Sequence, residues 1–132
     1  MIPCAYALMH RRRTKDYEKV FLALKQEGLK HGLNLQPKQI MTDFELAAIK
    51  AFKNSFIGIK SKGCLFHFGQ SLMKHLANIG LKKRYEDNED LKKWLNRLFS
   101  LALCPLQDVD DQWKKILEAK PSVPRIDEFQ KY

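Results

Sequence analysis

Three sets of residues have the types and spacing to do chemistry, and the first is a single carboxylate. Asp43 follows a short run, Lys38–Thr42, that predicts a β-strand, and it precedes a stretch with helical periodicity. A carboxylate at the carboxyl end of a strand lies on the edge of an α/β sheet where functional sites commonly form. Asp is also favoured at the N-cap of a helix. Asp43 is therefore a candidate catalytic and metal-binding residue, a helix N-cap, or both.

The second set is a thiol and an imidazole three residues apart. Cys64 and His67 begin a periodic stretch that predicts a helix, so they would lie on the same side of its first turn. Thiolate and imidazole are both good zinc ligands, but a structural zinc site requires about four ligands. His75 lies too far along the helix to be a confident third ligand. The alternative is a small buried thiol beside a hydrogen-bonded histidine.

The third set is basic and gathers in the first part of the chain. The 132 residues carry a formal net charge of +9, and Lys and Arg outnumber Asp and Glu by 11 over residues 1–85. Such asymmetry favours a polyanionic partner, most simply nucleic acid. The candidate nucleic-acid-binding residues are Arg11, Arg12, Arg13, Lys60 and Lys62. A solvated lysine-rich surface is the alternative, and the arginine run also resembles a short nuclear-import patch.

Composition narrows the class of protein further. Hydrophobic residues make up 45% of the chain, which is enough for a core, and no stretch approaches the length of a membrane span. The apolar opening precedes its arginines, the reverse of a signal peptide, so we expect a protein that is not secreted. Three Cys without paired spacing indicate a reducing compartment. No Gly-rich phosphate loop or other small-molecule motif is present, and oligomeric state is left open.

The elements that must position these residues alternate along the first 80 residues. Strands are expected at Ile2–Met9, Lys38–Thr42 and Phe56–Ile59, and helices at about residues 15–30 (after a Thr14 N-cap), 44–54 and 64–79. Alternation of this kind predicts an α/β fold with a largely parallel sheet. After Gly80 the periodicity predicts only helices, ended by Pro105 and Pro121.

Several strings, read together, carry a family resemblance. Thr42-Asp43-Phe44-Glu45 is followed by Gly63-Cys64-Leu65-Phe66-His67-Phe68, with matching segments at residues 3–9, 17–21 and 101–109. In this order and spacing they resemble the MULE transposase domain of Mutator-like DNA transposons. The resemblance covers nearly the whole chain.

The resemblance implies an RNase H-like fold and three catalytic acids that hold two divalent metals, Mg²⁺ or Mn²⁺, for cleavage and transfer of DNA strands. Asp43 matches the second acid, and Cys64 and His67 match a Cys-x-x-His motif that lies between the second and third acids. By this resemblance residues 1–80 are a partial transposase core of three short strands, and residues 81–120 begin an all-helical insertion. The prolines at positions 121 and 124 predict that residues 121–132 are a linker and a truncated end.

The chain departs from the family at two of the three acids. Nothing in it matches the first acid or the third, and the first two strands of the family's sheet have no counterpart, so we expect a truncated core of marginal stability. One carboxylate does not assemble a two-metal site, so we expect this chain alone to be inactive and to bind no metal tightly. The alternatives are a non-catalytic DNA- or protein-binding remnant of a transposase and a degenerate gene fragment. A nuclear location and DNA as partner are the matching expectations.

Overall fold

The computed structural model describes residues 5–129, and the chain forms two compact units, residues 1–64 and 65–132. The first unit contains α1 (Thr14–Lys30), β1 (Gln39–Thr42), α2 (Leu46–Ser55) and β2 (Lys60–Gly63). The second contains α3 (Leu65–Asn78), α4 (Lys82–Asp87), α5 (Glu89–Ser100), short 3-10 turns at Leu101–Leu103 and Leu106–Asp108, α6 (Val109–Glu118) and α7 (Ile126–Phe129). The expected segment boundary at Gly80 rests on the family resemblance and stays a prediction.

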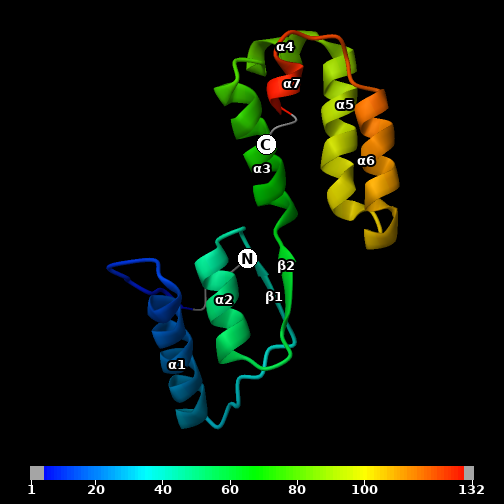
Figure 1. Ribbon diagram of the computed structural model, residues 1–132. Coiled ribbons are helices and arrows are strands. Elements are labelled where there is room, and N and C mark those ends of the chain that lie inside the picture. The colour runs from blue at the N-terminus through cyan, green and yellow to red at the C-terminus, as the bar shows by residue number, and fades with distance from the viewer. Residues whose placement is uncertain (1–4, 130–132) are drawn as a thin grey trace. The chain divides into compact units, whose positions relative to one another are not determined.

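The first unit is built on a parallel pair of strands. β1 and β2 pair in parallel from Gln39 opposite Lys60 to Thr42 opposite Gly63, and Figure 1 shows α2 as the helix that connects them. Parallel strands require a crossover connection of this kind because the chain must return to the same end of the sheet. Over the described residues the structure therefore combines helices with a two-stranded parallel sheet, which is compatible with the expected α/β fold.

One face of this sheet carries the core of the unit. Ile40 of β1 is buried with Phe21 of α1, and Ala51, Phe56 and Ile59 complete the cluster. The ring centroids of Phe21 and Phe52 lie 4.0 Å apart, which joins α1 to α2. On the other face Met41, Lys60 and Lys62 are exposed. Successive side chains of a strand point to opposite faces, so the sheet has one covered and one open face.

Two of the three expected strands need correction. Residues 2–4 lie outside the described part of the chain, and Ala5–Met9 forms no strand. Tyr6 and Leu8 are almost fully exposed there, because no described strand offers their backbone a partner. The strand expected at Phe56–Ile59 begins later, at Lys60, since Phe56 and Ile59 are core residues around a turn at Gly58. No third strand occurs within residues 5–129.

The helices expected within residues 15–79 are confirmed within one or two residues, with one correction to a cap, whereas the helix expected to end at Pro105 already ends at Ser100. Thr14 is the first residue of α1, and the N-cap is Arg13. The backbone N–H of Arg13 donates to Asp16 Oδ2 at 3.1 Å. Asp16 is the third residue of the helix, so its side chain satisfies the backbone N–H of the N-cap residue. This is one of the two hydrogen bonds of a capping box. Thr14 therefore has no capping role.

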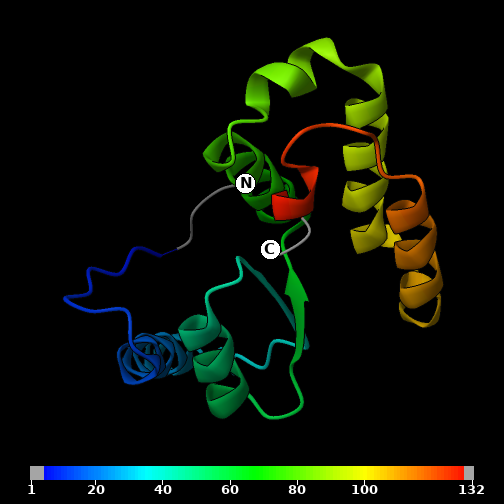
Figure 2. The same cartoon turned by 45° about the horizontal axis from the view of Figure 1, so that its top comes forward.

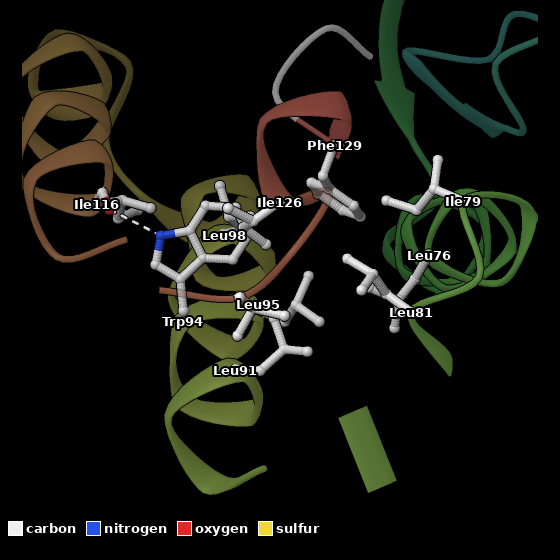
Figure 3. Packing of buried hydrophobic residues seen from close by; sticks show 11 residues of the cluster. Leu76, Ile79, Leu81, Leu91, Trp94, Leu95, Leu98, Ile116, Ile126 and Phe129 are labelled. Atoms are coloured by element: carbon white, nitrogen blue, oxygen red, sulfur yellow. Dashed lines mark hydrogen bonds between the residues drawn. The ribbon is translucent and has the colours of Figure 1, made fainter. Parts of the chain in front are cut away.

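The second unit is held by an apolar cluster centred on α5. Leu91, Trp94, Leu95 and Leu98 lie along one side of α5 and are buried, as Figure 3 shows. The indole Nε1–H of Trp94 donates to the carbonyl oxygen of Ile116 at 2.8 Å. This hydrogen bond ties α5 to α6, and the two helices run side by side in both views (Figures 1 and 2). Buried polar groups require such partners.

A glycine ends α3 and redirects the chain into this cluster. Gly80 has φ 76°, a left-handed conformation that favours glycine. The N–H of Leu81 donates to Leu76 O at 2.9 Å and that of Gly80 to Ala77 O at 3.0 Å. This is the Schellman pattern, with its usual apolar contact supplied by Leu76 and Leu81.

The segment after Pro121 is expected to be a linker, but its described residues pack into the core of the second unit. Val123, Ile126 and Phe129 are all buried in the cluster of the second unit. Three apolar side chains at regular spacing complete the core, which explains why the segment packs although prolines flank its start. No helix among residues 5–129 is long and apolar enough to cross a membrane.

The core of the second unit predicts a large effect of one truncation. Leu91→Ala empties a fully buried site and should lower the free energy of unfolding of this unit by about 2–5 kcal/mol, through lost burial and a residual cavity. The matched control is Leu106→Ala, because Leu106 is 88% exposed, and it should change stability by less than about 0.5 kcal/mol. Urea unfolding followed by tryptophan fluorescence measures both. Equal effects of the two variants would contradict this packing.

Candidate functional site at the carboxyl end of the sheet

Asp43 lies directly after β1 and is exposed. Its Oδ1 accepts a hydrogen bond from the backbone N–H of Glu45 at 3.2 Å. This local turn delays the start of α2 to Leu46, with Glu45 as the N-cap residue. Asp43 is therefore not the N-cap of α2, and the cap alternative is wrong. Its carboxylate stands in solvent at the carboxyl end of a parallel strand, with one oxygen engaged in the turn.

A hydrogen bond from α1 holds this turn. The phenol O–H of Tyr17 donates to Glu45 Oε2 at 2.8 Å across 28 positions of sequence, in a half-buried setting. Burial and the Glu45 carboxylate raise the pKa of Tyr17 above its usual value, while the positive charge of Arg12 opposes the rise. Tyr17, Glu45, Asp43 and Arg12 thus share one electrostatic neighbourhood.

The ring of Phe44 lies against the end of the neighbouring strand. A side chain at Gly63 would bring its Cβ within 2.7 Å of Phe44 Cε1. Glycine at the last position of β2 therefore lets the ring lie on the backbone. Phe44 is 53% exposed, so an aromatic edge borders Asp43 at this end of the sheet.

The three predicted arginines are not equivalent. The guanidinium of Arg13 pairs with Asp16, with Nε to Oδ2 at 3.0 Å, and hydrogen bonding from Arg13 lowers the pKa of Asp16. Arg11 and Arg12 are exposed and have no ion pair within residues 5–129. Arg11 and Arg12 are accordingly the arginines available to a phosphate, whereas Arg13 already serves the start of α1.

The two predicted lysines belong to the open face of the sheet. Lys60 and Lys62 alternate with Ser61 along β2, and Lys62 lies opposite Met41 in the register. Both lysines are exposed, and neither forms an ion pair in the part of the chain that the structure describes. The core of the unit, which includes α1 residues, lies on the opposite face, so the structure does not unite the lysines with the arginines.

Cys64 and His67 have different settings. The backbone N–H of Cys64 donates to Thr42 O at 2.8 Å, which extends the parallel ladder beyond β2. α3 therefore begins at Leu65, and Cys64 is not in the helical turn that contains His67. Cys64 ends the first unit and is half-buried, and His67 is an exposed residue of the second. His75 packs its ring on Phe129, with centroids 5.0 Å apart.

The donor sets do not fit the metals that the family resemblance implies. Among residues 5–129 no group of three or more His, Cys, Asp or Glu side chains could hold a metal ion. Glu45, two residues after Asp43, has its Oε2 engaged as the acceptor from Tyr17. Two divalent cations in one pocket need several carboxylates, so these residues by themselves do not make a two-metal site.

Sequence reasoning missed Tyr17 and Glu45 as partners. Tyr17 enters the sequence analysis only within the matching segment at residues 17–21, and in the structure it also packs against the apolar cluster of the first unit. A hydroxyl on an otherwise apolar face is the available signal, because a buried tyrosine O–H usually finds a hydrogen-bond partner. Glu45 lies within the string that carries the resemblance, two residues after Asp43.

Comparison with known proteins gives one family. The MULE transposase domain matches residues 1–71, which is more than half of the chain. The matched region contains Asp43, Tyr17, both lysines of β2 and the Cys64–His67 motif. No curated protein and no solved structure matches the chain.

The Tyr17–Glu45 hydrogen bond predicts a pH dependence of stability. Because the pKa of Tyr17 is raised in the folded chain, its contribution is complete below the unfolded pKa of about 10 and is lost as pH rises through the folded pKa. Tyr17→Phe should cost about 0.5–1.5 kcal/mol at pH 7 and make the alkaline fall shallower. Urea unfolding between pH 7 and pH 11 measures this, with Tyr6→Phe as control because Tyr6 is 87% exposed. Parallel curves for the wild type and Tyr17→Phe would refute the contact.

Metal analysis tests the zinc candidates. With two ligands rather than about four, the dialysed chain should contain far less than one zinc per chain. Cys64→Ala and His67→Ala should then leave the metal content unchanged, as measured by mass spectrometry of the bound metals. Stoichiometric zinc that either substitution removes would show a site at Cys64 and His67.

Proposed function

Because the chain belongs to the MULE transposase domain family, we propose that it is part of a transposase core that contacts DNA through its first unit. The observation that carries the proposal is the placement of Asp43, exposed at the carboxyl end of a parallel strand. Functional sites of α/β proteins commonly form at this edge of the sheet. A transposase acts on DNA, and within residues 1–64 Lys and Arg outnumber Asp and Glu by 7, which suits that partner.

We assign β1, α2 and β2 to an RNase H-like core and Asp43 to the second of its three catalytic acids. The parallel pairing and the crossover through α2 support this assignment. The Tyr17–Glu45 contact supports it further, because it holds the turn in which the N–H of Glu45 donates to Asp43 Oδ1. The divalent metals would supply activation of a water or a DNA 3′-hydroxyl in the parent reaction.

The 132-residue chain by itself should not cleave DNA. It supplies Asp43 but no match to the first and third acids, and its described residues hold no three-residue metal group. A binding role without catalysis is the second candidate, and the charge asymmetry favours it. We also propose a location in the nucleus, supported by the arginine run at residues 11–13.

A nicking assay on terminal-repeat DNA tests the inactivity. The purified chain and its Asp43→Ala variant should both leave supercoiled substrate intact with Mg²⁺ or Mn²⁺, because one carboxylate cannot hold two mutually repelling cations. The same preparations should be retained on immobilised duplex DNA at low salt and released as salt rises. Metal-dependent nicking that Asp43→Ala abolishes would overturn the inactivity, and retention unchanged by salt would overturn the DNA contact.

A further inference from the structure

We propose that a pocket at the amino ends of β1 and β2 binds a phosphate of the DNA backbone. This inference rests on the proposed DNA contact and specifies where it is made. The pocket has a volume of about 580 Å³ and lies at the end of the sheet opposite to Asp43. Its lining residues are Gln36, Pro37, Lys38, Gln39, Ile57, Gly58 and Lys60. The volume lies within the range of ligand pockets, about 300–1,000 Å³.

The strand pairing places two lysines around one pocket. The backbone N–H of Lys60 donates to the carbonyl oxygen of Lys38 at 3.0 Å, and the residue opposite Lys60 in the register is Gln39, which follows Lys38. Lys38 precedes β1 and Lys60 begins β2. Both lysines line the same pocket, although 22 positions separate them in sequence. Only the parallel register creates this pair.

The pocket is positive and has no internal counter-charge. No Asp or Glu lines it, and neither lysine has an ion pair within residues 5–129. Positive side chains around a hollow that no acidic residue lines attract anions to it. An anion is therefore the complementary ligand, and the two lysines supply charge-assisted donors for it.

The remaining lining favours a phosphate with a sugar attached. The Gln36 amide donates to Asn34 Oδ1 at 3.5 Å and has a second N–H, and Gln39 adds another amide. Gly58, at φ 73°, has nothing within 4 Å of its would-be Cβ, so bare backbone forms that wall. Ile57 is fully exposed at the rim, where it can cover the apolar face of a deoxyribose. A free phosphate shares the anionic chemistry but would leave Ile57 without a partner.

The test compares matched lysine pairs in the full chain. Fluorescence anisotropy with a labelled duplex at several salt concentrations gives both Kd and its salt dependence. Lys38→Gln combined with Lys60→Gln should raise Kd by about 10-fold or more at 0.1 M salt and reduce the log–log salt slope by about 1–2. Lys93→Gln with Lys115→Gln changes the net charge equally on exposed residues of the second unit, and it should raise Kd less than about 3-fold.

The outcomes separate this inference from the DNA contact itself. If the wild type shows no salt-dependent binding, the DNA contact fails. If it binds but both double variants weaken binding equally, DNA binds without this pocket. Inorganic phosphate, titrated against the amide signals of Gly58 and Lys60 at constant ionic strength, should act only in the millimolar range. Saturation at micromolar phosphate would instead make free phosphate the ligand. Circular dichroism melts confirm that the variants, all on exposed side chains, remain folded.

Discussion

The parallel pairing of β1 with β2 is the constraint on which the rest of the first unit depends. Parallel strands share both their amino ends and their carboxyl ends. The carboxyl ends bring Asp43 beside Gly63 and Cys64, and the amino ends bring Lys38 beside Lys60. The crossover through α2 then determines where α1 packs, because Phe21 and Phe52 stack between the two helices. Asp43 and the pocket lined by Lys38 and Lys60 thereby lie at opposite ends of one short ladder.

The second unit obeys a different constraint, which is burial around α5. Its helices are short and carry many charges, so tertiary packing must stabilise them more than helix propensity does. Trp94 contributes both apolar burial and a hydrogen bond, since it is nearly fully buried and its indole N–H donates to Ile116 O. The residues from Pro121 to Phe129 pack in this unit because Val123, Ile126 and Phe129 are buried in its apolar cluster.

Much of the architecture could be predicted because it is encoded locally. The helices follow from apolar spacing such as Tyr17, Val20, Phe21 and Leu24, and Gly80 ends α3 as a left-handed cap should. The strands were less predictable. Lys60–Gly63 has no buried residue, so its pairing leaves no apolar pattern to detect, while Phe56 and Ile59 have the pattern but pack around a turn. The start of α2 depends on the Asp43–Glu45 hydrogen bond, which composition does not reveal.

The candidate site residues show the same difference between local signals and long-range contacts. Asp43 could be predicted because a carboxylate after a short strand is a local signal. The Tyr17–Glu45 contact and the Lys38–Lys60 pair could not, because 28 positions separate the first two residues and 22 the second two. Arg13 could not be separated from Arg11 and Arg12 until its pairing with Asp16 was seen.

Amide hydrogen exchange in the intact chain tests the parallel pairing most directly. The N–H of Lys60 bonds to Lys38 O and that of Cys64 to Thr42 O, so both amides should exchange at least about 100-fold more slowly than in an unstructured peptide. Exposed backbone at Ala5–Met9 should exchange at the unprotected rate and serves as the internal reference. Exchange of Lys60 and Cys64 at that same unprotected rate would contradict the pairing, and with it both ends of the sheet as sites.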